Sequence, residues 1–128
     1  MSKILLVEPD RVLAKTYHQS LVSAGHEVHT CNSAQAAIIA ADQICPDVVV
    51  LELQLVAHSG VEFLYEFRSY PDWQDIPVVV HTSVPPNRFA SNFADVRTQL
   101  RISQYLYKPL TSLRQLRETV QAVSTIGV

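Results

Sequence analysis

The chain has 128 residues, a length that suits one domain and leaves little room for a second, so we expect a single domain over residues 1–128. Hydrophobic residues make up 48% of the chain, and no internal repeat, low-complexity segment or Gly/Ser-rich linker occurs, which excludes a disordered or fibrous protein. The formal net charge is -2 and no run of Lys or Arg is present, so we expect no nucleic-acid partner.

The apolar run at the N-terminus, residues 4–7, ends at Glu8 and is too short for a signal-peptide core or a membrane span. Cys31 and Cys45 have no metal-ligand spacing, and we interpret them as two reduced thiols. We therefore expect a cytoplasmic protein with no membrane partner.

Short apolar runs alternate along the chain with longer segments of helical period. The runs predict strands at residues 4–7, 27–30, 48–51, 78–80 and 104–107. Near-continuous apolar strands indicate a parallel sheet that helices cover on both faces. The pattern predicts an α/β fold of the flavodoxin-like, doubly wound kind, with five parallel strands in the order 2-1-3-4-5.

For three of the intervening helices, the sequence indicates where the helix starts or which residues form its apolar face. Ser59 and Glu62 have the spacing of a capping box, which predicts a helix from about residue 60. A helix starting near Asn87 would carry an apolar stripe at residues 89, 93, 96 and 100. A C-terminal helix from residue 113 would dock the stripe at residues 116, 120 and 123 on the sheet.

Polar residues follow four of the predicted strands. These residues are Glu8, Glu52, the pair Thr82 and Ser83, and Lys108. Because the carboxyl ends of parallel strands meet at one edge of a sheet, we expect these side chains to converge on one pocket. Two carboxylates, a hydroxyl and an ammonium there could hold a cation, a phosphate or one another.

Other candidate sites are weaker. His26 and His29 have H-x-x-H spacing, but in a turn into an edge strand, so we favour ordinary surface histidines over metal ligands. Three glycines are too few for a glycine-rich phosphate loop, and no nucleophile has a catalytic context, so we expect no enzyme and no catalytic residue. The aromatic residues at 65, 67, 70 and 73 form either core or a binding face, with core favoured.

Five segments of the chain resemble the response-regulator receiver domain (CheY-like) over essentially the whole length. They are residues 3–8 (KILLVE), 46–53 (PDVVVLEL), 59–64 (SGVEFL), 76–83 (IPVVVHTS) and 105–110 (YLYKPL). The resemblance implies a module of two-component phosphorelay signalling. It places Glu52 at the phosphoacceptor position and Glu8 and Asp10 in the acidic pocket. The same resemblance makes Thr82 the switch hydroxyl, Tyr105 the switch aromatic and Lys108 the phosphate-sensing lysine.

Two departures from the family indicate a degenerate variant, or pseudo-receiver. Glu52 replaces the acceptor aspartate, and Pro9 replaces the second acid of the metal-binding pair. The added methylene moves the carboxylate by about 1.5 Å, and a shift of about 1 Å can cost roughly a hundredfold in a positioned reaction. We therefore expect no phosphorylation, no cofactor and lost or weak Mg²⁺ binding. With no phosphate between them, Glu52 and Lys108 should form a direct charge-assisted contact.

The output side also departs from the family, because residues 82–105 are longer than usual and Arg101-Ile102-Ser103 replaces a small Gly-Ala pair. We expect action through protein contacts, with a histidine kinase or another signalling protein, or a second copy in a homodimer, as the partner. Two alternatives stay open. One is a receiver that is still phosphorylated at another site, and the other is a small-molecule or nucleotide binder that uses the strand-end pocket.

Overall fold

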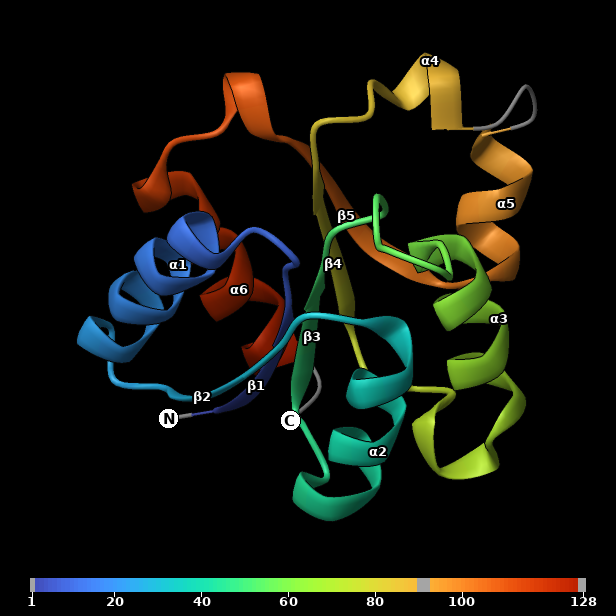
Figure 1. Cartoon of the computed structure of the whole chain (residues 1–128), viewed down its shortest axis with the longest axis horizontal. Coiled ribbons are helices and arrows are strands. Elements are labelled where there is room, and N and C mark those ends of the chain that lie inside the picture. The colour runs from blue at the N-terminus through green and yellow to red at the C-terminus, as the bar shows by residue number, and fades with distance from the viewer. Residues whose placement is uncertain (1, 90–92, 127–128) are drawn as a thin grey trace.

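The computed structural model describes residues 2–89 and 93–126 and shows one five-stranded sheet, all parallel (Figure 1). The strands are β1 (Lys3–Val7), β2 (Glu27–Cys31), β3 (Val48–Leu51), β4 (Val78–Thr82) and β5 (Ile102–Tyr107). Their order in the sheet is β2-β1-β3-β4-β5. The flavodoxin-like fold and the strand order predicted from the sequence are confirmed.

Helices cover both faces of this sheet (Figure 1). They are α1 (Arg11–Ser23), α2 (Ala34–Ile44), α3 (Gly60–Ser69), α4 (Pro86–Phe89), α5 (Phe93–Gln99) and α6 (Leu113–Ile126), with 3₁₀ turns η1 (Pro71–Trp73) and η2 (Lys108–Leu110). Alternate strand residues point to opposite faces. Ile4 and Leu6 pack with α1 and α6, while Leu5 and Val7 pack with α2 and α3. The inner strands are therefore apolar on both faces, apart from Lys3 at the start of β1 and His81 and Thr82 at the end of β4.

The helix expected from Asn87 through residue 100 is present as two elements, α4 and α5. Residues 90–92 between them lie outside the described residues, as do the side chains of Phe89 and Phe93 from the expected stripe. The stripe is confirmed at its other end, where Val96 is half-buried and Leu100 is 2% exposed against the core. α4 begins one residue earlier than expected, with Pro86 at the first helical position, where proline fits.

Two arginines hold the turn between α5 and β5. Arg68 of α3 donates to the carbonyl oxygens of Trp73, Leu100 and Arg101 at 2.6, 2.9 and 2.9 Å. Arg101 has a φ of 53°, in the left-handed region where glycine is favoured, and it pairs with Asp75 at 3.0 Å. Arg101, the first of the altered residues and the one that precedes β5, is therefore fixed to α3 and to the loop after it.

The expectations for the histidines and for the aromatic residues at 65, 67, 70 and 73 had mixed outcomes. His26 is not a surface residue: it is 6% exposed, and its Nδ1 accepts from the amide of Ser2 at 3.2 Å. The aromatic group divides, since Phe67 and Trp73 are buried and stacked while Tyr65 and Tyr70 are 50% and 43% exposed. Within the described ranges, no helix is long and apolar enough to cross a membrane.

Candidate functional site

Four polar side chains meet at the carboxyl edge of the sheet. Glu8 follows β1, Glu52 follows β3, Thr82 ends β4 and Lys108 follows β5. Glu8, Glu52 and Thr82 are 3%, 4% and 0% exposed, so these three side chains are buried, and the side chain of Lys108 is 11% exposed. The edge is where doubly wound folds place their sites, because parallel strands deliver their carboxyl ends together.

The ammonium of Lys108 bridges the two buried carboxylates. Its Nζ donates to Glu8 Oε1 at 2.6 Å and to Glu52 Oε1 at 2.8 Å. The predicted contact between Glu52 and Lys108 is confirmed. The Glu8 contact was missed, although β1 and β3 are neighbours in the predicted order, which places Glu8 beside Glu52.

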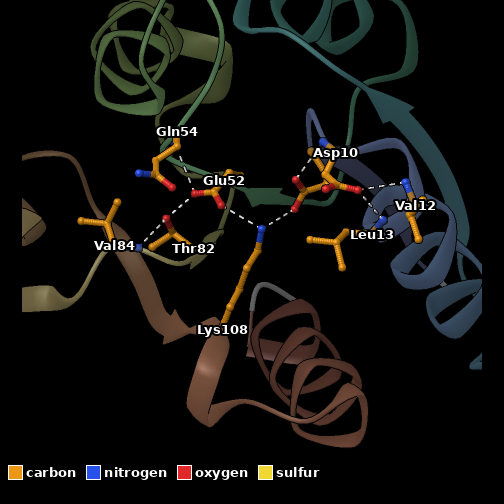
Figure 2. A network of polar contacts seen from close by, with 9 residues as sticks. Asp10, Val12, Leu13, Glu52, Gln54, Thr82, Val84 and Lys108 are labelled. Carbon is orange, nitrogen blue, oxygen red and sulfur yellow. Dashed lines mark hydrogen bonds and ion pairs between the residues drawn. The ribbon is translucent and has the colours of Figure 1, made fainter.

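The other carboxylate oxygens also have donors (Figure 2). Glu8 Oε2 accepts from the amide of Asp10 at 3.2 Å. Glu52 Oε2 accepts from the hydroxyl of Thr82 and from the amide of Gln54, the latter at 3.1 Å. Each oxygen of this buried pair therefore accepts at least one hydrogen bond, which offsets the cost of burying the charges.

Both members of the central pair are held in their charged forms. Burial acts to raise the pKa of Glu52, but hydrogen bonds from Lys108, Thr82 and the Gln54 amide outweigh it, and the pKa lies below its usual value. Burial acts to lower the pKa of Lys108, but hydrogen bonds to Glu52 and Glu8 outweigh it, and the pKa is raised. At neutral pH Glu52 is therefore a carboxylate and Lys108 an ammonium.

A chain of hydrogen bonds leads from this pocket to β5. The Thr82 hydroxyl donates to Glu52 and accepts from the amide of Val84 at 3.2 Å. The carbonyl oxygen of Val84 in turn accepts from the hydroxyl of Tyr105 at 2.7 Å. Burial, and secondarily the charge of Glu52, raise the pKa of Tyr105 to about 12, so its hydroxyl stays protonated and can donate. The side chain of Tyr105 is thereby tied to the carboxylate of Glu52.

Asp10 lies outside this network, contrary to its expected place in the acidic pocket. Its carboxylate is the N-cap of α1, where Oδ1 accepts from the amides of Val12 and Leu13 at 2.9 and 3.0 Å (Figure 2). Only its backbone amide reaches the pocket, through Glu8. An aspartate directly before an amphipathic stretch is a capping signal in the sequence, and that signal predicts this arrangement.

Two buried rings beneath Lys108 were not identified from the sequence as part of the site. The ring of Tyr17 in α1 lies with its centroid 5.7 Å from Lys108 Nζ, and His81 of β4 meets that ring edge-on at 4.7 Å. Burial, followed by the charge of Lys108, lowers the pKa of His81 to about 4, so this imidazole is neutral at pH 7. The ring of Tyr17 thus lies between the ammonium of Lys108 and the imidazole of His81 in a chain of contacts.

The residues present do not fit a magnesium site. Pro9 has no side-chain oxygen, Asp10 caps α1, and the carboxylates of Glu8 and Glu52 already bind Lys108. Mg²⁺ needs near-octahedral oxygen ligation with one or two available carboxylates. Across residues 2–89 and 93–126, no cluster of three His, Cys, Asp or Glu side chains could hold a metal ion.

The segment after Glu52 is fixed by a close approach at the start of α3. A Cβ built on Gly60 would lie 2.7 Å from Leu53 Cα and 2.8 Å from the carbonyl oxygen of Glu52. The amide of Gly60 also donates to the carbonyl of Leu53 at 2.8 Å, and Ser59 caps the helix as predicted by accepting from the Glu62 amide. Only glycine allows α3 to begin this close to Glu52.

An all-parallel sheet with acidic residues, a hydroxyl and a lysine at its carboxyl edge defines a receiver-type signalling domain. The chain belongs to the family of response regulator receiver domains, whose model matches residues 4–121. It is therefore a receiver domain of two-component signal transduction, a signalling module.

Curated relatives and solved structures agree with this membership. The chain is 28% identical over 80 residues to the KDP operon transcriptional regulatory protein KdpE of Escherichia coli. The aligned residues cover 62% of this chain and 34% of that protein. It is 34% identical over 80 residues to the probable transcriptional regulatory protein TcrX of Mycobacterium tuberculosis, covering 62% and 33%. The chain thus matches about a third of the length of these relatives.

Among solved structures, the chemotaxis protein CheY4 of Vibrio cholerae has a TM-score of 0.84 at 22% identity, covering 96% of this chain and 98% of that one. A sensor protein from Polaromonas sp. JS666 has a TM-score of 0.87 at 20% identity, with 98% of each chain covered. At these identities the likeness shows the fold.

Proposed function

We propose that this receiver signals without phosphorylation, because Lys108 and Glu52 hold its pocket permanently in one state. The observation that carries the proposal is the ammonium of Lys108 at 2.6 and 2.8 Å from the two buried carboxylates, with Thr82 on the far oxygen of Glu52. The side chains that would contact an incoming phosphate already form ion pairs and hydrogen bonds with one another.

Glutamate in this position imitates a phosphorylated acceptor only in part. Its carboxylate reaches both Lys108 and Thr82, but a phosphoryl group carries about -1.5 to -2 charges and three acceptor oxygens. The hydrogen bonds through Val84 to Tyr105 support a fixed output surface. The alternative of a small-molecule binder is less favoured, since Lys108 and Thr82 already donate to the carboxylates that a ligand at the strand ends would meet.

The test is phosphorylation by acetyl phosphate with Mg²⁺, read by intact mass. We expect no labile phosphoryl adduct on the native chain, because the acceptor carboxylate is displaced and paired with Lys108. The double variant Glu52→Asp with Pro9→Asp restores an aspartate acceptor and the second metal acid, and we expect it to gain an adduct. An adduct on the native chain that Glu52→Gln abolishes would contradict the proposal.

We further propose that a protein partner, such as a histidine kinase, another signalling protein or a second copy, docks on the surface formed by α4, α5, β5 and α6. Tyr105 ends the hydrogen-bonded chain there, and Gln104 beside it is exposed on this edge strand. A second candidate surface lies at the carboxyl edge of the sheet, on the segments that follow β1, β3 and β5. We call it the pocket mouth; it includes Val12, Val56 and Leu110, which are 74%, 76% and 77% exposed. Exposed apolar groups of this kind anchor interfaces.

Substitutions separate the two surfaces. In a pull-down or self-association assay of partner capture, we expect Gln104→Ala and Tyr105→Ala each to weaken the affinity for the partner about tenfold. This is the effect of losing roughly 1.4 kcal/mol of binding free energy. Leu110→Asp at the pocket mouth and Lys15→Ala on α1 should leave capture unchanged. Arg97 and Arg101 are poor probes, because their guanidinium groups hold backbone carbonyls of β5 and of the loop at Gln74. Loss of capture in Leu110→Asp alone would assign docking to the pocket mouth.

A further inference from the structure

A groove with a volume of about 580 Å³ lies between α2 and α3, two neighbouring helices on the same side of the sheet (Figure 1). Its walls include Gln35, Ile38 and Ile39 from α2 and Glu62, Phe63 and Glu66 from α3. None of these residues takes part in the pocket around Lys108. The groove is therefore a separate feature of the molecule.

The floor of the groove is apolar. Phe63 is buried, Ile38 is half-buried, and Ile39 is 55% exposed. A single exposed isoleucine is unremarkable on a protein surface, but Ile39 lines a hollow that is already shaped by two helices. An apolar side chain that enters the hollow would remove Ile38 and Ile39 from water together.

The charge of the groove is negative. Glu62 and Glu66 are exposed and lie one helical turn apart on α3, while α2 has Asp42 as its one charged residue. No Lys or Arg is among the residues that line the groove. His58 meets Glu62 at 3.0 Å, but both side chains are more than 60% exposed, so this pair is weak and exchanges readily for a stronger cation.

We infer that this groove binds a basic amphipathic helix of a partner protein. Cations spaced four residues apart on such a helix match the spacing of Glu62 and Glu66, and an apolar residue on the same face reaches Ile38 and Ile39. The site does not depend on whether Glu52 accepts phosphate. None of the residues that line the groove belongs to β5 or to the pocket around Lys108.

Binding of a labelled peptide tests the inference. The probe is a fluorescein-labelled amphipathic peptide of Leu, Lys and Ala at helical spacing, measured by fluorescence anisotropy at about 0.15 M salt, where long-range charge effects are screened. A peptide of the same composition in scrambled order has the same charge but no apolar face. We expect the full chain to bind the amphipathic peptide at least about tenfold more tightly than the scrambled one.

Three variants place the binding in the groove. We expect Ile39→Asp and Glu66→Lys each to weaken binding about tenfold. Glu118→Lys makes the same charge change on α6, where Glu118 is exposed and pairs with Arg114 at 2.9 Å, and it should leave binding unchanged. Circular dichroism of each variant checks that the fold is intact.

Equal binding of the two peptides, equal weakening by Glu118→Lys and Glu66→Lys, or no binding of the amphipathic peptide would overturn the inference. Self-association of the native chain that Glu66→Lys abolishes would also overturn it, because the occupant would then be a second copy. Sedimentation velocity of the native chain and of Glu66→Lys measures this last outcome.

Discussion

Lys108→Met is expected to destabilise the protein by about 3–5 kcal/mol at pH 7, because it leaves two buried carboxylates without their shared cation. Glu8 and Glu52 are only 3% and 4% exposed, so water cannot replace the ammonium. Urea unfolding measures the loss. Lys15→Met removes an exposed lysine from α1 and is the matched control, for which we expect a change within about 0.5 kcal/mol.

The cost of Lys108→Met should depend on pH in a defined direction. In the native chain the pKa of Glu52 is lowered, so its contribution to stability is present above the unfolded pKa and is lost as the pH falls below about 4.5. In the variant, burial and like charge raise the pKa of one carboxyl above its unfolded value. Protonation of that carboxyl relieves the penalty as the pH falls, so the two stabilities should converge between pH 7 and about pH 4.5.

Adding Glu52→Gln to Lys108→Met removes one of the two unpaired charges and should recover part of the lost stability at pH 7. A cost for Lys108→Met no larger than that for Lys15→Met, at every pH, would contradict the bridging role of Lys108.

Gly60→Ala is expected to destabilise the protein by about 1–3 kcal/mol, because the new methyl group has no space to occupy. It would lie 2.7 Å from Leu53 Cα and 2.8 Å from the Glu52 carbonyl, and both are backbone atoms that cannot rotate away. Either α3 or the segment after Glu52 must move. Because the Gln54 amide donates to Glu52, movement of this segment should also disturb the pocket.

Thermal and urea unfolding measure the stability, and the amide resonances of Gln54 and Val84 report on the pocket by NMR. Glu66→Ala, at an exposed position in the same helix, is the control and should change neither readout. A stable Gly60→Ala variant with unshifted Gln54 and Val84 resonances would show that α3 can retreat from Leu53 without affecting Glu52.

The consequences of the two predictions differ for signalling. Lys108 sets the charge balance of the pocket, whereas Gly60 sets the position of the backbone that delivers Glu52. If the locked state described under the proposed function is correct, both substitutions should alter partner capture through Thr82 and Tyr105, even though neither residue lies on the proposed docking surface.

The strands, their order and the convergence of four polar residues could be predicted from the sequence alone, the four being Glu8, Glu52, Thr82 and Lys108. Apolar runs and helical periods are local, and the parallel topology follows from their alternation, so the residues after each strand must meet at one edge. The contact between Glu52 and Lys108 could be predicted on the same ground, since each residue directly follows a strand.

The tertiary structure decided which partner each polar group takes. Asp10 is an exception, because a capping signal in the sequence predicts that its carboxylate accepts from the free amides at the start of α1, which lie two and three residues away. The second contact of Lys108, to Glu8, depends on how far the lysine reaches from the end of β5 past β4 and β3 toward β1. The burial of His26 likewise depends on a neighbour distant in sequence, Ser2, and the close approach at Gly60 depends on how the loop after Glu52 folds back on α3.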